Sequence, residues 1–365
     1  MTPIYSLRPS VTISECGRRS VRLVRSPDAH ITLRGELGST LRLLSDLRSP
    51  SSLDAILESR PAPSERATAE RHFHRLLTAG FMIEGSPPLN FRDHSLSRQL
   101  SYFALTSGSW ESVLQRQDRL RRASVTLIGL GGIGSSIAMA LCRAGVGRLV
   151  LVDGDVVSET NLNRQLLYDC ADIGARKVSV ATRKLQSASL SAELVAVAET
   201  ISTEADFARC AEGSDITVFS GDEPRQHILS ILNRGMVRAG HPFLPCGYIG
   251  SAGVVGPMVL PHKSPCLSCE PGLLARDSSP KARPLGDLSG HVTAVRASTI
   301  PASFGPMCAL VGNVAAAEAI RHLTSDAEDA PVTRAHIWLF DMLTLEAQLY
   351  PLARWPDCPT CGERG

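Results

Sequence analysis

Three glycines and an aspartate are spaced as in a phosphate-binding loop and the strand that follows it. Gly129, Gly131 and Gly134 come directly after the apolar run 125–128, and the residues beyond them resume helical spacing. Glycines let the backbone approach a phosphate, and a helix N-terminus offers unpaired N–H groups and a positive dipole end. Asp153 ends the next apolar run, where an acidic side chain would bind a ribose hydroxyl. The pattern predicts a nucleotide site without naming the nucleotide, because dinucleotide oxidoreductases share it.

Polar side chains after Asp153 narrow the choice of nucleotide. A dehydrogenase needs only the acidic residue here, whereas this chain adds Asn161, Arg164 and Lys177. An arginine can hold phosphate oxygens through two parallel hydrogen bonds, and a lysine supplies a point charge. These side chains suit a triphosphate, so a nicotinamide-dependent oxidoreductase remains only as a more distant alternative.

Four of the ten cysteines form two Cys-x-x-Cys motifs, Cys266 with Cys269 and Cys358 with Cys361. In a chain expected to be cytoplasmic, this is the spacing of a metal site rather than of disulfides. Four thiolates complete a tetrahedral coordination shell, so the motifs predict a closed, structural Zn²⁺ site. Cys308 lies just inside an expected helix start, where a thiolate could be stabilised. A chemical role for it and a role as a small core residue both remain open.

The elements that must position these residues alternate between strands and helices from residue 124 to about 246. The alternation predicts an α/β fold with a Rossmann-like, doubly wound, mainly parallel sheet. An antiparallel extension is expected beyond it. Helices are expected to begin near Gly174, Thr203 and Pro224. The extension comprises a pair of strands within 250–260, a mobile Ser-, Pro- and Gly-rich loop over 271–304, a helix over 309–322 and a hairpin of strands 337–341 and 343–350.

Residues 1–90 are interpreted as a separate domain, and residues 91–365 carry the nucleotide and zinc sites. Three short β-rich pieces, three helical pieces and a closing strand at Phe81–Ile83 predict a winged-helix-like fold. Ser52 and Ser64 are the expected N-caps of the second and third helices. The last helix mixes arginines with glutamates, which does not favour DNA binding.

Composition excludes several classes of partner. Lys plus Arg number 38 and Asp plus Glu number 36, so the net charge of +2 gives no electrostatic reason to expect nucleic acid or an anionic membrane. The first residues have no signal-peptide pattern, and no apolar run reaches membrane-spanning length. A soluble, cytoplasmic protein is therefore expected.

The order of the polar residues resembles a known family. The stretch Asp153-Gly-Asp-Val-Val-Ser-Glu-Thr-Asn-Leu-Asn-Arg-Gln165, followed by Gly174-Ala-Arg-Lys177, is similar to the signature of the ubiquitin-activating superfamily of adenylating enzymes, typified by ThiF and MoeB. Within that superfamily the chain most resembles the MccB type, which modifies the microcin C precursor peptide, and more loosely the PaaA type of pantocin A biosynthesis. The supporting stretches are Val218-Phe-Ser-Gly-Asp-Glu-Pro, Cys246-Gly-Tyr-Ile-Gly-Ser-Ala-Gly-Val-Val-Gly-Pro, Pro301-Ala-Ser-Phe-Gly-Pro and the final Cys-Pro-Thr-Cys-Gly.

The resemblance implies a role for each matching residue. It implies a Mg²⁺ ligand at Asp222 and, at Arg98, the arginine that a neighbouring subunit contributes, hence a homodimer. Glu223 departs from the family pattern, in which many relatives have Asn after the metal-binding Asp. The residues implied to bind ATP are Gly129, Gly131, Gly132, Gly134, Asp153, Asp155, Asn161, Arg164, Gln165 and Lys177, with Arg164, Lys177, Asp222 and Arg98 acting in catalysis.

The function that this resemblance implies is ATP-dependent adenylation of a carboxylate in a ribosomally synthesised precursor peptide, in antibiotic biosynthesis. Residues 1–90 would then bind the leader peptide. The product could retain a nucleotide, as in the MccB type, or be cyclised through a glutamate, as in the PaaA type. The alternative is activation of a sulfur-carrier protein, as by ThiF and MoeB. Residues 270–307 contain no cysteine, which argues against the thioester transfer of ubiquitin activators.

Overall fold

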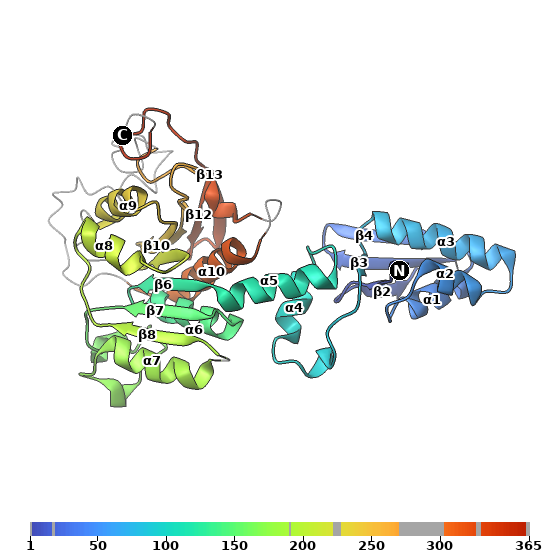
Figure 1. Ribbon diagram of the computed structural model, residues 1–365, viewed down its shortest axis with the longest axis horizontal. Coiled ribbons are helices and arrows are strands. Elements are labelled where there is room, and N and C mark those ends of the chain that lie inside the picture. Colours follow the sequence, from blue (N-terminus) through green and yellow to red (C-terminus); the bar gives the residue numbers. More distant parts are fainter. Residues whose placement is uncertain are drawn as a thin grey trace. The chain divides into compact units, whose positions relative to one another are not determined.

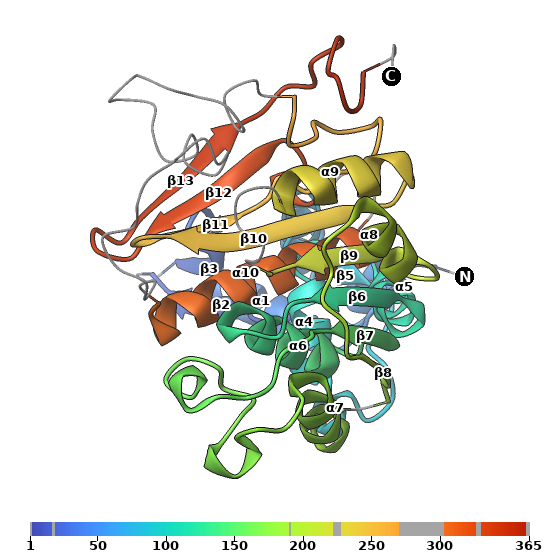
Figure 2. The ribbon, with the colours of Figure 1, turned by 90° about the vertical axis from the view of Figure 1, so that its left-hand side faces the viewer.

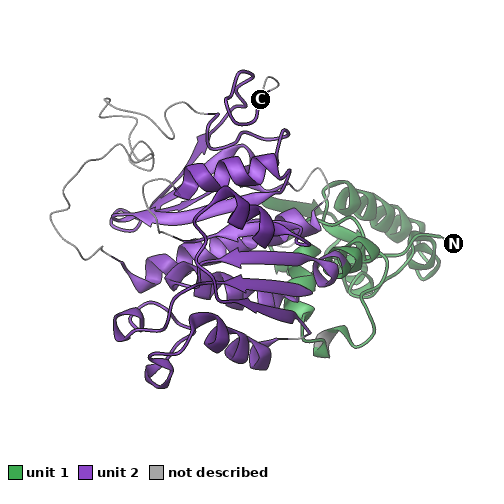
Figure 3. Cartoon of the chain, turned by 60° about the vertical axis from the view of Figure 1, so that its left-hand side comes forward, with its two compact units in different colours: residues 1–118 green, residues 119–365 purple. Residues whose placement is uncertain are grey.

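The computed structural model describes residues 2–16, 19–189, 191–221, 228–269, 303–325 and 330–362. The chain comprises two compact units, Met1–Asp118 and Arg119–Gly365 (Figures 1 and 3). Several sequence-based expectations lie outside the described residues: Asp222, Glu223, the helix start near Pro224 and nearly all of the loop 271–304. Within the part of the chain that is described, no helix is long and apolar enough to cross a membrane.

An eight-stranded sheet forms the centre of the C-terminal unit, in the order β13-β12-β11-β10-β9-β6-β7-β8 (Figure 2). Neighbours from β10 to β8 are parallel, and β11, β12 and β13 extend the sheet antiparallel. This confirms the expected α/β fold with a mainly parallel sheet. The strands are β6 (Ser124–Ile128), β7 (Arg148–Val152), β8 (Glu193–Val197), β9 (Ile216–Phe219), β10 (Phe243–Ile249), β11 (Ala252–Val255), β12 (His336–Asp341) and β13 (Glu346–Pro351).

Two apolar cores lie on opposite faces of this sheet. Leu149 and Leu151 of β7 belong to one core, while Val150 and Val152 belong to the other, because successive strand residues point to opposite faces. Helices α6, α7 and α10 contribute to the first core, and α8 and α9 to the second. The doubly wound arrangement follows. The helices are α6 (Gly132–Ala144), α7 (Lys177–Ala188), α8 (Glu204–Ala211), α9 (Ile228–Arg238) and α10 (Gly305–Thr324).

The expected pair of strands within 250–260 is wrong. That segment holds one strand, β11, and an isolated bridge from Val259 to Phe243; β11 forms a hairpin with the preceding strand β10, which turns at Gly250 with φ of +57°. The sequence also predicts a strand over residues 242–245, which would end at Pro245. In the structure its carbonyl accepts a hydrogen bond from the Gly256 N–H at 2.9 Å, and the strand continues to Ile249.

The N-terminal unit begins with a β-rich part followed by three helices, in the order expected from the sequence. Strands β2, β3 and β4 form one sheet, and β1 pairs with β5. The winged-helix interpretation stays a prediction. The elements are β1 (Tyr5–Leu7), β2 (Thr12–Glu15), β3 (Ser20–Ser26), β4 (Ala29–Arg34), α1 (Leu37–Asp46), α2 (Leu53–Glu58), α3 (Pro63–Thr78), β5 (Met82–Glu84), α4 (Ser97–Phe103) and α5 (Trp110–Arg122), which extends past the unit boundary.

Of the two predicted helix caps, the structure confirms Ser52 and not Ser64. The Ser52 hydroxyl caps α2 by accepting a hydrogen bond from the Ala55 N–H at 3.2 Å, as expected. Ser64 does not cap α3, whose N-cap is Ala62. Pro63 occupies the first helical position, where its fixed φ suits the helix and its missing N–H costs nothing. Ser64 is therefore already inside the helix.

Hydrogen bonds connect the residues just before α5 with the β-rich part of this unit. The Arg8 guanidinium donates to the carbonyls of Gly80 at 2.8 Å and Ser107 at 2.6 Å. The Glu84 N–H donates to the Gly108 carbonyl at 3.2 Å. The compact unit thus ends at Asp118, beyond the boundary near residue 90 that composition suggests.

His322, near the end of α10, should make the stability of the C-terminal unit depend on pH. Burial, then the neighbouring Arg334, lower the pKa of His322 to about 4 from its ordinary 6.5. Between these values the unfolded chain binds a proton that the folded chain does not, so stability should fall as the pH drops from 6.5 towards 4 and be unaffected above 6.5. Thermal unfolding across this range should show a shallower decline for His322→Gln than for the wild type; equal declines would contradict this origin.

Candidate functional site

The predicted phosphate loop follows β6 at the carboxyl end of the parallel strands. Gly129 has φ of +94°, and a Cβ there would lie 2.8 Å from the Gly221 nitrogen. A Cβ on Gly134 would lie 1.9 Å from the Gly129 carbonyl oxygen, and one on Gly132 would lie 2.9 Å from the Cys308 Sγ. A Cβ on Gly131 would meet nothing closer than the Gln165 Nε2 at 3.8 Å. Three of the glycines are thus required by close packing, and Gly131 leaves space at the helix N-terminus.

Asp153 connects the end of β7 to this loop. Its Oδ2 accepts a hydrogen bond from the Leu130 N–H at 2.7 Å, and its Oδ1 accepts one from the Asp155 N–H at 2.8 Å. The side chain is only 8% exposed. The carboxylate is therefore fixed in place, with lone pairs left for a further donor such as a hydroxyl.

Lys177 is the first residue of α7 and brings a buried positive charge to the same place. Its side chain is 6% exposed, and its Nζ lies 2.7 Å from the Asp155 Oδ2 and 4.0 Å from the Asp153 Oδ1. Asp155 itself is largely exposed. The structure thus brings together Asp153, Asp155 and Lys177, three of the residues predicted to bind ATP. The carboxylate partners offset the cost of burying the ammonium.

The segment between β7 and α7 carries the other predicted residues. The Asn161 Oδ1 accepts a hydrogen bond from the Ser158 N–H at 3.1 Å, so it caps a short helical turn. The Arg164 Nη1 donates to the Thr160 carbonyl at 2.7 Å and to the Asn163 Oδ1 at 3.0 Å. Both side chains are thus engaged within their own segment.

Gln165 differs from its neighbours in having an unsatisfied atom. The residue is 4% exposed, and its buried Oε1 has no hydrogen-bond partner among the described residues. An unpaired buried acceptor is costly, and native proteins pair most such groups. A ligand or solvent donor beside the phosphate loop would satisfy it.

Tyr168 is a residue that the sequence analysis missed. Its hydroxyl donates to the Leu130 carbonyl at 3.0 Å, in the middle of the glycine loop, and the residue is 6% exposed. An aromatic residue shortly after a polar motif resembles any core residue in the sequence. Only the fold shows that its polar end reaches the loop.

Cys308 packs against the first turn of α6 and is almost fully buried. Burial raises the pKa of its thiol, and a hydrogen bond with Ser303 and the charge of Arg164 only partly oppose this. A protonated, buried thiol is a poor nucleophile. The surroundings therefore favour the interpretation of Cys308 as a small core residue.

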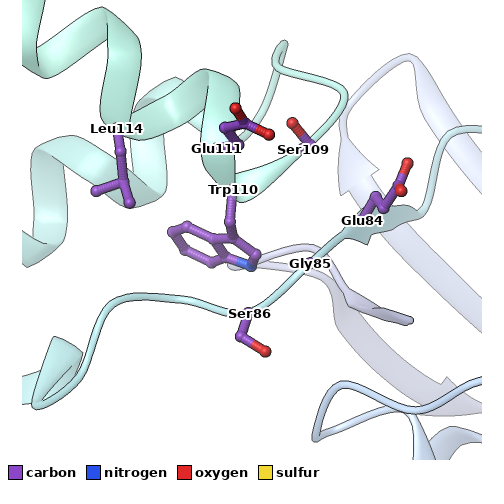
Figure 4. A pocket seen from close by; sticks show the side chains of 7 residues that line it. All are labelled: Glu84, Gly85, Ser86, Ser109, Trp110, Glu111 and Leu114. Carbon is purple, nitrogen blue, oxygen red and sulfur yellow. The ribbon is translucent and has the colours of Figure 1, made fainter. Parts of the chain in front are cut away.

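Arg98 lies exposed on α4, in the N-terminal unit. It is therefore not among the residues that the C-terminal unit brings together. The same N-terminal unit contains a pocket of about 450 Å³ between the end of β5 and the start of α5 (Figure 4). The residues that line it are Glu84, Gly85, Ser86, Ser109, Trp110, Glu111 and Leu114.

The four predicted metal ligands form one buried cluster. The sulfurs of Cys266, Cys269, Cys358 and Cys361 all lie within 4.8 Å of one another. The Cys266–Cys358 and Cys269–Cys361 sulfur distances are 3.6 and 3.3 Å. A tetrahedral zinc ion with bonds of about 2.3 Å separates its sulfurs by about 3.8 Å. The cluster could therefore hold a metal ion and would connect the C-terminal segment to the loop after β11.

Comparison with known proteins agrees with this geometry. The ThiF family matches residues 96–360. The sulfur carrier protein adenylyltransferase of Thermus thermophilus is 31% identical over 248 residues, which cover 68% of this chain and 85% of that protein. The molybdopterin-synthase adenylyltransferase of Escherichia coli is 27% identical over 247 residues, which cover 68% and 90%.

Solved structures resemble a larger part of the chain. The structure of E. coli MccB with ATP has a TM-score of 0.81 at 23% identity, covering 98% of this chain and 100% of that one. PaaA has a TM-score of 0.68 at 16% identity, covering 94% and 99%. The family match spans most of the chain and includes the residues of the C-terminal unit that are predicted to bind the nucleotide. The chain is an adenylyltransferase of the ThiF family.

Proposed function

We propose that this enzyme uses ATP to adenylate a carboxylate of a ribosomally synthesised precursor peptide. The observation that carries the proposal is the extent of the likeness to MccB, which covers 98% of the chain and so takes in the N-terminal unit. The sulfur-carrier relative matches only 68% of the chain, and the family match begins at residue 96. An enzyme that acts on a carrier protein has no evident use for the additional unit. One MccB structure holds N-formylated MccA.

The N-terminal unit is proposed to bind the leader part of the peptide. Residues 1–90 contain a separate apolar core that supports this unit. Two concave surfaces belong to the unit, the pocket of about 450 Å³ in Figure 4 and another of about 440 Å³ that includes Arg19 and Arg34. They offer surface on which a peptide segment could lie.

The nucleotide is proposed to lie over the glycine loop. Asp153, whose carboxylate is already oriented by two backbone N–H groups, would accept from the ribose. Lys177 would exchange part of its pairing with Asp155 for the phosphates, and Arg164 would turn from its own segment to reach them. The unsatisfied Gln165 Oε1 supports a ligand at this place. The further residues proposed to contact ATP are Gly129, Gly131, Gly132, Gly134, Asp155 and Asn161.

The chemistry needs charge stabilisation rather than a protein base. A peptide carboxylate has no proton to lose at neutral pH, and its oxygen attacks the α-phosphate while pyrophosphate leaves. Groups such as Lys177 and Arg164 would stabilise charge on the separating phosphates, an effect commonly worth about 3–4 kcal/mol per group. Mg²⁺ would add to it, with Asp222 as its proposed ligand from the family resemblance. Arg98 is proposed to act across a homodimer.

Two substrates remain to be distinguished by experiment. The purified enzyme, Mg²⁺ and ATP should be incubated with a candidate precursor peptide, and separately with a carrier protein that ends in Gly-Gly. We expect ATP–pyrophosphate exchange and a change in substrate mass in the incubation with the peptide, and neither in the incubation with the carrier protein. A mass gain of a nucleotide would indicate the MccB type of product, and loss of water with AMP release would indicate cyclisation. If the carrier protein supported exchange and none of the peptides did, the result would contradict the proposal and favour sulfur-carrier activation.

A further inference from the structure

The glycine loop is held from both sides at one residue. The N–H of Leu130 donates to the Asp153 Oδ2 at 2.7 Å, and its carbonyl accepts from the Tyr168 hydroxyl at 3.0 Å. Asp153 directly follows β7, whereas Tyr168 belongs to the segment that carries Arg164 and Gln165. The Tyr168 bond therefore joins the glycine loop, over which the nucleotide is proposed to lie, to the segment that carries Arg164 and Gln165.

The segment that carries Arg164 is also held to α7, by ion pairs near its C-terminal end. The buried Asp172 carboxylate pairs with Arg183 at 2.6 Å and with Lys184 at 2.5 Å. The Gly174 N–H donates to the Val157 carbonyl at 2.9 Å, which closes the segment on itself. One end is thus held by ion pairs to a helix. The hydroxyl of Tyr168 provides a direct hydrogen bond from this segment to the glycine loop.

We propose that Tyr168 is a positioning residue for the nucleotide: its hydroxyl sets the distance between the glycine loop and the segment that carries Arg164 and Gln165. The proposal rests on the proposed nucleotide site. A binding site that is already arranged loses less conformational freedom when its ligand binds. If the segment could occupy other positions, the competent arrangement would be only partly populated and the apparent affinity would fall by that fraction.

A substitution can separate the effect of the Tyr168 hydroxyl from that of its ring. The ring of Tyr168 belongs to the apolar core of the C-terminal unit, where a phenylalanine would fill the same volume. Burial, then the negative charge of Asp153, raises the pKa of Tyr168, so the hydroxyl stays protonated at neutral pH and can donate. Tyr168→Phe therefore removes the hydrogen bond and leaves the packing.

Thr126→Val is the matched control. Thr126 lies on β6 and is fully buried; its hydroxyl donates to the Cys210 carbonyl at 2.9 Å and lies 2.7 Å from the Ser214 hydroxyl. Both substitutions delete one buried hydroxyl of the same unit and keep the side-chain shape. Both should lower the unfolding temperature. Only Tyr168→Phe loosens the proposed nucleotide site.

The test is calorimetric titration of the full-length wild type and both variants with ATP in Mg²⁺, without any peptide. We expect Tyr168→Phe to weaken ATP binding about 3- to 10-fold, the usual effect of one neutral hydrogen bond, and Thr126→Val to leave it unchanged. Unchanged affinity in Tyr168→Phe, or an equal loss in both variants, would overturn the proposal. Because no peptide is present, this result is independent of the peptide hypothesis. Absence of ATP binding by the wild type would overturn both.

Discussion

Lys177→Met should reduce ATP–pyrophosphate exchange by about 100- to 1,000-fold, the usual cost of removing one preorganised charge-stabilising group. The Lys177 ammonium is 6% exposed and lies 2.7 Å from the Asp155 carboxylate, so it is already desolvated and oriented. Once part of its pairing with Asp155 is exchanged for the phosphates, the ammonium can stabilise the charge that builds up on the departing pyrophosphate. Exchange kinetics with the acceptor peptide should show the loss in the maximal rate as well as in the apparent affinity for ATP.

The substitution also removes a partner of Asp153, so stability must be followed separately. Lys177 lies 4.0 Å from the Asp153 Oδ1, and leaving a buried carboxylate without that cation is destabilising. The unfolding temperature should be measured beside the exchange rate, and assays should be run well below it. Lys263→Met, which removes an exposed lysine of the same unit, is the control and should keep full exchange. Full exchange in a folded Lys177→Met protein would contradict its proposed role.

The sequence alone predicts those features of the site that depend on short-range order. A glycine loop between an apolar run and a helix, and an aspartate at the next strand end, occupy fixed positions in any such β-α-β unit. Asp153 and Lys177 accordingly lie together in the structure. The spacing within each Cys-x-x-Cys motif is also a short-range feature of the sequence. In the structure the two motifs lie together in one cluster.

Features that depend on long-range contacts could not be predicted. The Tyr168 hydroxyl bonds a residue 38 positions earlier, and no periodicity marks such a pair. The Asn161 amide caps its own turn, which a family signature does not indicate. Ser64 was misplaced for a local reason, because serine and proline compete for the start of α3 and the proline takes the first helical position. The continuation of β10 beyond Pro245 could not be predicted either, because it depends on pairing with β11, in which the Gly256 N–H donates to the Pro245 carbonyl.

Cys358→Ser should remove bound zinc and lower the unfolding temperature of the C-terminal unit by about 10 °C, because loss of a structural metal belongs to the most destabilising changes. Cys358 is 3% exposed, and its Sγ lies 3.6 Å from that of Cys266. Hydrogen bonds from the Asn233 amide at 3.6 Å and the Ser268 N–H at 3.4 Å orient the Cys266 sulfur, as outer-shell groups do in metal sites. Zinc content by elemental mass spectrometry and thermal unfolding would measure both effects.

The control must separate loss of zinc from loss of a buried thiol. Cys142→Ser changes a fully buried cysteine of the same unit that lies outside the cluster, so it should lower stability while zinc content stays at one ion per chain. A chelator should then lower the unfolding temperature of wild type and Cys142→Ser but not that of Cys358→Ser, which has no ion left to lose. Zinc retained in Cys358→Ser, or a wild type whose unfolding is indifferent to the chelator, would show that the four cysteines stabilise the chain by packing rather than by coordination.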